Sequence, residues 1–146
     1  MVVFKKGNQI YRNPVFGKYI DPNDIQPGTF SSPQFLSTLS CLAEREENIK
    51  RLIESQKINE NGFYYVRLNI NGVWRYISVD ESLPEIDEIP LGARSYNDSE
   101  GDLWAALIEK AYAKAYNGYN VFKNTTISRE HYLRDLTGVP VRKINV

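Results

Sequence analysis

Residues 102–116 read DLWAALIEKAYAKAY, the longest helical pattern of the chain. Their apolar side chains recur at the three- and four-residue spacing of an amphipathic helix, which predicts a helix from about Asp102 to Tyr116. The apolar stripe of this helix consists of Leu103, Trp104, Leu107, Ile108, Ala111 and Tyr112. A stripe of this width needs cover, so we expect the helix to lie against the core.

Residues 63–79 predict the surface that covers the helix. They alternate apolar and polar side chains on both sides of Asn71-Gly72, a pair typical of a tight hairpin turn. One face of the first strand is expected to meet the core through Tyr64, Val66, Leu68 and Ile70. Pro84 and Pro90 are expected to end the sheet region.

Three shorter helices complete the prediction. The first begins after Ser32, a favourable N-cap, with Pro33 at the first helical position. The second is expected over residues 46–55, and the third over residues 128–136. Residues 7–32 contain many glycines, prolines and Asx residues, which indicates an irregular, turn-rich segment. Helices, a hairpin and then more helices predict an α+β fold rather than a parallel sheet.

Composition excludes several classes of protein. The 146 residues include 42% hydrophobic and 25% charged side chains, with 18 basic residues balancing 18 acidic ones. Zero net charge argues against a nucleic-acid partner, and no segment has the ~20 apolar residues that a membrane span needs. A single cysteine excludes an internal disulfide and suits a reducing compartment. We therefore expect a cytoplasmic protein, with association with the cytoskeleton left open.

Three segments carry a resemblance to a known family. Residues 102–114 closely match the motif Glu-Phe-Trp-x-x-Leu-Leu-Glu-Lys-Ala-Tyr-Ala-Lys, and residues 73–84 match Trp-x-x-Val-x-Val-Asp-Asp-x-Leu-Pro. Residues 135–138 are similar to Asp-Phe-Thr-Gly. In this order, the motifs resemble the first, nucleophile-bearing subdomain of the calpain cysteine-protease core.

The resemblance implies a domain layout and a fold. It predicts an irregular lead-in at residues 1–32, the calpain-like subdomain at 33–138 and a C-terminal tail at 139–146. The implied fold is the helix-rich half of a papain-like, calpain protease core, an α+β structure with one β-hairpin.

The catalytic segment departs from the family pattern. The family reads Asp-x-x-Gln-Gly-x-Leu-Gly-Asp-Cys-Trp, and residues 24–34 read DIQPGTFSSPQ when they are aligned without gaps. Pro33 then occupies the position of the nucleophilic cysteine, and Pro27 that of the oxyanion-holding glutamine. A thiolate at a helix N-terminus is stabilised by free backbone N–H groups, whereas proline supplies no nucleophile and only begins the helix.

No other residue is expected to replace the nucleophile. A serine needs a base within about 3 Å of its oxygen, so Ser32 is interpreted as a helix cap and Ser31 as a neighbour of the site. Cys41 lies about two turns into the helix, and we expect it to be buried. His131 is expected to face solvent. The family's histidine and asparagine come from a second subdomain that this chain lacks.

The resemblance also implies a calcium site, although this remains one alternative. The family binds calcium through an Asp, a Glu and loop carbonyls, and the matching positions are Asp24 and Asp102. Glu100 is an additional candidate, and the carbonyls would come from residues 17–20. Both aspartates have a structural interpretation too, because acidic residues favour turns and the first turn of a helix.

These observations predict a catalytically inactive, calpain-like domain that serves as a scaffold or protein-interaction module. Its partner would be another protein or the missing second subdomain of a protease core. Two alternatives stay open: a calcium-responsive regulatory module, and part of a calpain-type endopeptidase completed by other chain segments. No cofactor other than calcium is implied.

Overall fold

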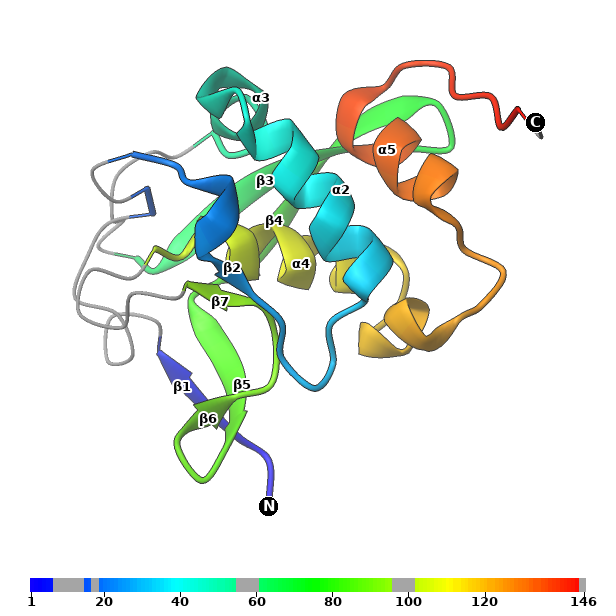
Figure 1. Ribbon diagram of the computed structural model, residues 1–146. Coiled ribbons are helices and arrows are strands. Elements are labelled where there is room, and N and C mark those ends of the chain that lie inside the picture. The colour runs from blue at the N-terminus through cyan, green and yellow to red at the C-terminus, as the bar shows by residue number, and fades with distance from the viewer. Residues whose placement is uncertain (7–14, 17–18, 55–60, 96–101, 145–146) are drawn as a thin grey trace.

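The computed structural model describes residues 1–6, 15–16, 19–54, 61–95 and 102–144 (Figure 1). Its strands are β1 (Val3–Lys6), β2 (Ile25–Gln26), β3 (Phe63–Ile70), β4 (Val73–Asp80), β5 (Ser82–Ile86), β6 (Ile89–Pro90) and β7 (Arg94–Ser95). Its α-helices are α2 (Pro33–Ala43), α3 (Glu46–Lys50), α4 (Trp104–Ala115) and α5 (Arg129–Thr137), and the short 3-10 helices are η1 (Pro22–Asp24) and η2 (Tyr119–Lys123). The mixture of helices and small antiparallel sheets confirms the α+β prediction.

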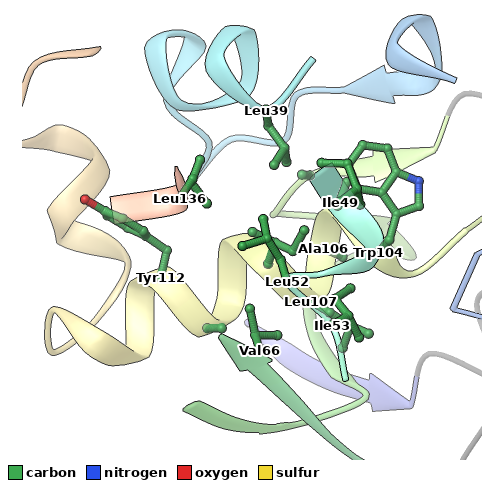
Figure 2. Close-up of a cluster of buried hydrophobic side chains, with 14 of the residues drawn as sticks. Leu39, Ile49, Leu52, Ile53, Val66, Trp104, Ala106, Leu107, Tyr112 and Leu136 are labelled. Atoms are coloured by element: carbon green, nitrogen blue, oxygen red, sulfur yellow. The ribbon is translucent and has the colours of Figure 1, made fainter. Parts of the chain in front are cut away.

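The core lies between α4 and the hairpin formed by β3 and β4. The hairpin has the predicted register, with Ile70 opposite Val73 and Phe63 opposite Asp80. Tyr64, Val66 and Leu68 are fully buried, and α4 packs against both strands. Figure 2 shows Leu107 of α4 among Leu52, Ile53 and Val66.

Helices α2 and α5 pack against each other beside α4, and α5 also packs against β3 (Figure 1). Helix α2 begins as predicted, with Pro33 in its first turn and the Ser32 hydroxyl accepting from the Phe35 N–H at 3.3 Å. Phe35 is fully buried, and its ring contacts the rings of Tyr112, Phe122 and Tyr132. These aromatic contacts join α2, α4, η2 and α5 around one point of the core.

Helix α3 is shorter than predicted. The helix ends at Lys50 because the next residues extend along β3: the Arg67 N–H donates to Leu52, and the Glu54 N–H donates to Tyr65. Ser55, the predicted end, lies outside the described residues.

Cys41 is exposed rather than buried as predicted, because it falls on the solvent face of α2 with the exposed Gln34 and Ser37.

Two small sheets were not predicted. Strands β1, β5 and β6 form one antiparallel sheet, and β2 pairs with β7 in another. Pro84 is part of β5 instead of ending the sheet region. The Pro84 carbonyl accepts from the Leu91 N–H at 2.9 Å. The Pro84 nitrogen, which carries no hydrogen, therefore points toward the short strand β6 rather than toward β1.

The segment predicted as an irregular lead-in, residues 1–32, contains regular elements in its described parts. Strand β1 extends along β5 at Val3–Lys6, and η1 leads directly into β2. The boundaries of the three predicted domains remain a prediction. Within the described residues, no helix has the length and apolar character needed to cross a membrane.

Candidate functional site

The segment that matches the family's catalytic segment is held by backbone contacts. Strand β2 pairs with β7, with Ile25 opposite Ser95, and the Phe30 N–H donates to the Leu91 carbonyl at 2.8 Å. Gly28 lies directly against the backbone of residues 91–92, so a Cβ at this position would clash with their carbonyl oxygens. Glycine is therefore required here by close backbone approach. The segment leads without interruption into α2.

Pro33 opens α2 at the position predicted for the nucleophile. It has no reactive side chain, and its missing N–H lies in the first turn, where no intrahelical bond is lost. The neighbouring Ser32 is buried, caps the helix and hydrogen-bonds with Tyr132. The start of α2 thus has structural roles for both residues.

The remaining candidate nucleophiles and bases are not brought together. Ser31 accepts from the Gly28 N–H at 3.1 Å, and Cys41 lies on the exposed face of α2. His131, the only histidine, is exposed as predicted, and its Nδ1 bonds with the N–H and hydroxyl of Ser128 in a capping box at the start of α5. These contacts place the imidazole in the cap of α5, against the Ser128 hydroxyl, and the described contacts do not join it to Ser31 or Cys41.

A buried carboxylate lies beneath this segment. Glu109 of α4 has no exposed surface, and its Oε2 accepts from the Ala93 N–H at 2.6 Å. Burial raises the pKa of Glu109 to about 7, against hydrogen bonds from Ser31 and Ala93 that lower it. Glu109 thus connects α4 to Ser31 and to Ala93, which precedes β7.

Two of the predicted calcium ligands line the same small pocket in the structure. Asp24 at the end of η1 and Asp102 before α4 line one small pocket, together with Arg94 and Ser95 of β7. Burial and the nearby charge of Asp21 raise the pKa of Asp24. Glu100 and residues 17–18 lie outside the described residues. In the described part of the chain, no three His, Cys, Asp or Glu side chains cluster as a metal site would require.

A pocket of about 350 Å³ opens beside Pro33. Its lining comes from residues 32–34 at the start of α2, residues 122–125 after α4, and Ile127 and Tyr132 of the α5 region. Sequence reasoning did not find this pocket, because its walls are far apart in the chain. It also missed Glu109, although a signal exists: Glu109 shares the helix face of Ala105 and Tyr112, an apolar face where a carboxylate stands out.

The sequence was also compared with known proteins. The model of the calpain family of cysteine proteases matches residues 1–146. The calpain-type cysteine protease DEK1 of Arabidopsis thaliana is 31% identical over 137 residues, which cover 93% of this chain and 6% of that protein. Calpain-7 of Sus scrofa is 32% identical over 119 residues, covering 74% and 14%.

A third relative, calpain-5 of Caenorhabditis elegans, is 28% identical over 153 residues, 99% of this chain and 23% of that protein. The chain thus spans 23% or less of each of these relatives. The family match covers the whole length of the chain, including the helix and the hairpin that carry its motifs. The chain belongs to the calpain family of cysteine proteases.

Proposed function

We propose that this calpain-family domain has no peptidase activity of its own and serves as a protein-interaction module. The observation that supports the proposal is Pro33, which begins α2 and which the ungapped alignment assigns to the position of the family's nucleophile. Amide hydrolysis through a covalent intermediate needs an attacking thiolate or alkoxide with a base in contact. In the described part of the chain, the His131 imidazole contacts the Ser128 hydroxyl in the cap of α5, and no described contact joins it to Cys41 or Ser31.

The peptidase test uses the purified 146-residue chain with casein and millimolar calcium. We expect no cleavage above the level of a buffer blank, and no labelling of Cys41 by a mechanism-based thiol inhibitor. Cleavage that disappears in Cys41→Ser, His131→Ala or Ser31→Ala would contradict the proposal. The alternative is an endopeptidase completed by other chain segments. It predicts that the inhibitor labels a longer chain that contains this domain and does not label the 146-residue chain.

The pocket beside Pro33 is the proposed contact surface for a partner. It combines apolar walls from Phe122 and Ile127 with polar groups from Gln34 and Asn124. Pockets of this size and mixed character accept a side chain of another protein. The partner would be a second subdomain of a protease core or a different protein.

Two arginine substitutions test this surface. Gln34 lines the pocket and Ser37 lies one turn further along the same exposed face of α2. In cross-linking of the tagged chain in its native source, we expect Gln34→Arg to remove the main cross-linked partner and Ser37→Arg to retain it. Equal partner recovery with both variants would show that the pocket is not the contact.

Calcium binding is a second candidate function, favoured by the shared pocket of Asp24 and Asp102. Calcium prefers six to eight oxygen ligands, and these two carboxylates would supply the side-chain oxygens of such a site. Burial, and then the charge of Asp21, raise the pKa of Asp24. A bound cation would offset the repulsion between these two carboxylates.

Thermal unfolding with and without calcium tests this candidate. At a hundredfold excess of calcium over its dissociation constant, the folded chain is expected to gain about 2.7 kcal/mol. Asp24→Ala should abolish that gain, whereas Glu44→Ala, which removes an exposed carboxylate from the end of α2, should retain it. An unchanged melting temperature at millimolar calcium would eliminate the candidate.

A further inference from the structure

Strand β4 has an edge whose backbone groups can be assigned residue by residue. The Arg67 N–H donates to Leu52 and the Tyr65 carbonyl accepts from Glu54, so the backbone of these two residues faces away from β4. Backbone direction alternates along a strand, so Val66 and Leu68 face β4, where they lie opposite Ile77 and Arg75. The N–H and carbonyl groups of the alternate residues of β4 therefore point to its outer edge.

Two lysines of α4 occupy one half of that edge. Lys114 Nζ donates to the Ser78 carbonyl at 2.6 Å, and Lys110 Nζ donates to the Asp80 carbonyl at 3.0 Å. In the other half, the N–H groups of Trp74 and Tyr76 donate no hydrogen bond to, and their carbonyls accept none from, any residue that the structure describes. We call residues 73–77 the β4 strip.

The β4 strip is exposed and aromatic. Val73 is 54% exposed, Trp74 37% and Tyr76 59%, and Arg75 between them is exposed too. The exposed rings of Phe63 and Tyr65 continue the outer face of the hairpin. An unpaired edge beside exposed aromatic rings is a template for an added strand.

The charges around the strip select the kind of strand. Residues 63–79 contain two arginines, Arg67 and Arg75, and no aspartate or glutamate. The Arg67 guanidinium lies 4.5 Å from the centre of the Trp74 ring, which keeps its charge beside the strip. In a symmetric pairing that places Trp74 opposite Tyr76 of a second copy, Arg75 would meet its own counterpart, and like charges opposite one another destabilise a sheet.

We propose that the β4 strip binds an extended, acidic segment of another protein as an additional antiparallel strand. The backbone of Trp74 and Tyr76 forms the ladder, and Arg75 and Arg67 pair with acidic side chains of the segment. The lysine-bonded carbonyls of Ser78 and Asp80 limit the ladder at one end. This surface shares no residue with the pocket beside Pro33, so the proposal goes beyond the proposed function and can be tested separately.

The probe is a displayed library of random twelve-residue peptides, selected on the 146-residue chain. We expect enrichment of proline-free peptides with acidic residues on both faces of the added strand, because Arg75 and Arg67 lie on opposite faces of the hairpin. Their binding should weaken as salt rises. Binding should slow hydrogen exchange at the Trp74 and Tyr76 amides. Tyr76→Pro removes an N–H from the outer edge without removing a β3–β4 bond, and it should weaken a selected peptide about tenfold or more.

Charge and backbone controls separate the contributions. Arg75→Glu should weaken the selected acidic peptide at least about tenfold, and Arg45→Glu, an equal charge change at the exposed start of α3, should leave its affinity unchanged. The same peptide with alternate N-methylated amides should fail to bind, which tests the ladder even where Tyr76→Pro disturbs the fold.

Three outcomes would overturn the proposal. The first is selection without enrichment of acidic sequences. The second is full binding by the N-methylated peptide. The third is a concentration-dependent dimer of the chain that Tyr76→Pro abolishes, because it would assign the strip to a second copy. None of these outcomes bears on the peptidase or Gln34→Arg tests.

Discussion

Replacing Asp135 by alanine is expected to lower the free energy of unfolding by about 3 kcal/mol, because two tyrosine hydroxyls lose their acceptor in the core. Asp135 is fully buried in α5, where its Oδ2 accepts from the Tyr112 hydroxyl at 2.9 Å and from the Tyr116 hydroxyl. Its Oδ1 pairs with the Arg134 guanidinium at 3.0 Å. Arg134 is 40% exposed, so this ion pair contributes the smaller part.

Urea unfolding followed by tryptophan fluorescence measures the effect. Asp135→Asn keeps an acceptor oxygen for the tyrosines, and we expect it to lose less stability than Asp135→Ala. Arg129→Ala removes an exposed side chain from the same helix and should change the free energy by less than about 0.5 kcal/mol. A loss below about 1 kcal/mol in Asp135→Ala would mean that the tyrosine hydroxyls find other partners.

The Asp135 contacts also explain why two of the family motifs occur together. Tyr112 belongs to the long helix motif and Asp135 to the Asp-Leu-Thr-Gly segment that ends α5. Gly138 closes that helix in a left-handed conformation with φ of 72°. The motifs are therefore two sides of one buried hydrogen-bond cluster that fixes α5 to α4.

The sequence predicted those elements whose determinants are local. The Asn71-Gly72 turn sets the hairpin register, and both residues have the positive φ that such a turn requires. The cap at Ser32 and the proline at position 33 define the start of α2 within the sequence itself. Helix α4 was predicted about two residues too long at its start, since Asp102 and Leu103 precede it.

The missed elements depend on contacts between distant residues. Strand β1 is recognisable only through its pairing with β5, about eighty residues away. Helix α3 ends early because β3 offers backbone partners to Leu52 and Glu54, which a local pattern cannot reveal. Cys41 was placed among apolar neighbours in sequence, but the phase of α2 puts it on the solvent face.

The candidate site also has one part that local sequence signals predict and another that depends on contacts between distant segments. The start of α2 at Pro33 followed from local sequence signals, and Asp24 and Asp102, which the resemblance selected, line one pocket. The pocket beside Pro33 and the free edge of β4 required knowledge of which segments meet. Glu109 required the same knowledge, because its partner, the Ala93 N–H, is sixteen residues away.

Glu109 is expected to make the stability of the fold depend on pH. Its pKa in the folded chain is about 7, above the ordinary value of 4.5, because burial disfavours the charged carboxylate. Between these two values, the folded chain binds a proton that the unfolded chain has released. Folding is therefore favoured by this group at low pH, and its contribution is lost as pH rises through about 7.

Glu109→Gln is expected to remove this dependence, because an amide keeps an acceptor for the Ala93 N–H and does not titrate. From pH 4.5 to above 7, the free energy of unfolding of the wild-type chain should fall relative to that of the variant by on the order of 3 kcal/mol. Urea unfolding at both ends of this range measures the difference. Glu47→Gln, at an exposed position of α3, should follow the wild-type profile. Parallel profiles for the wild-type chain and Glu109→Gln would show that Glu109 is charged in the folded chain throughout this range, with the Ser31 and Ala93 hydrogen bonds outweighing its burial.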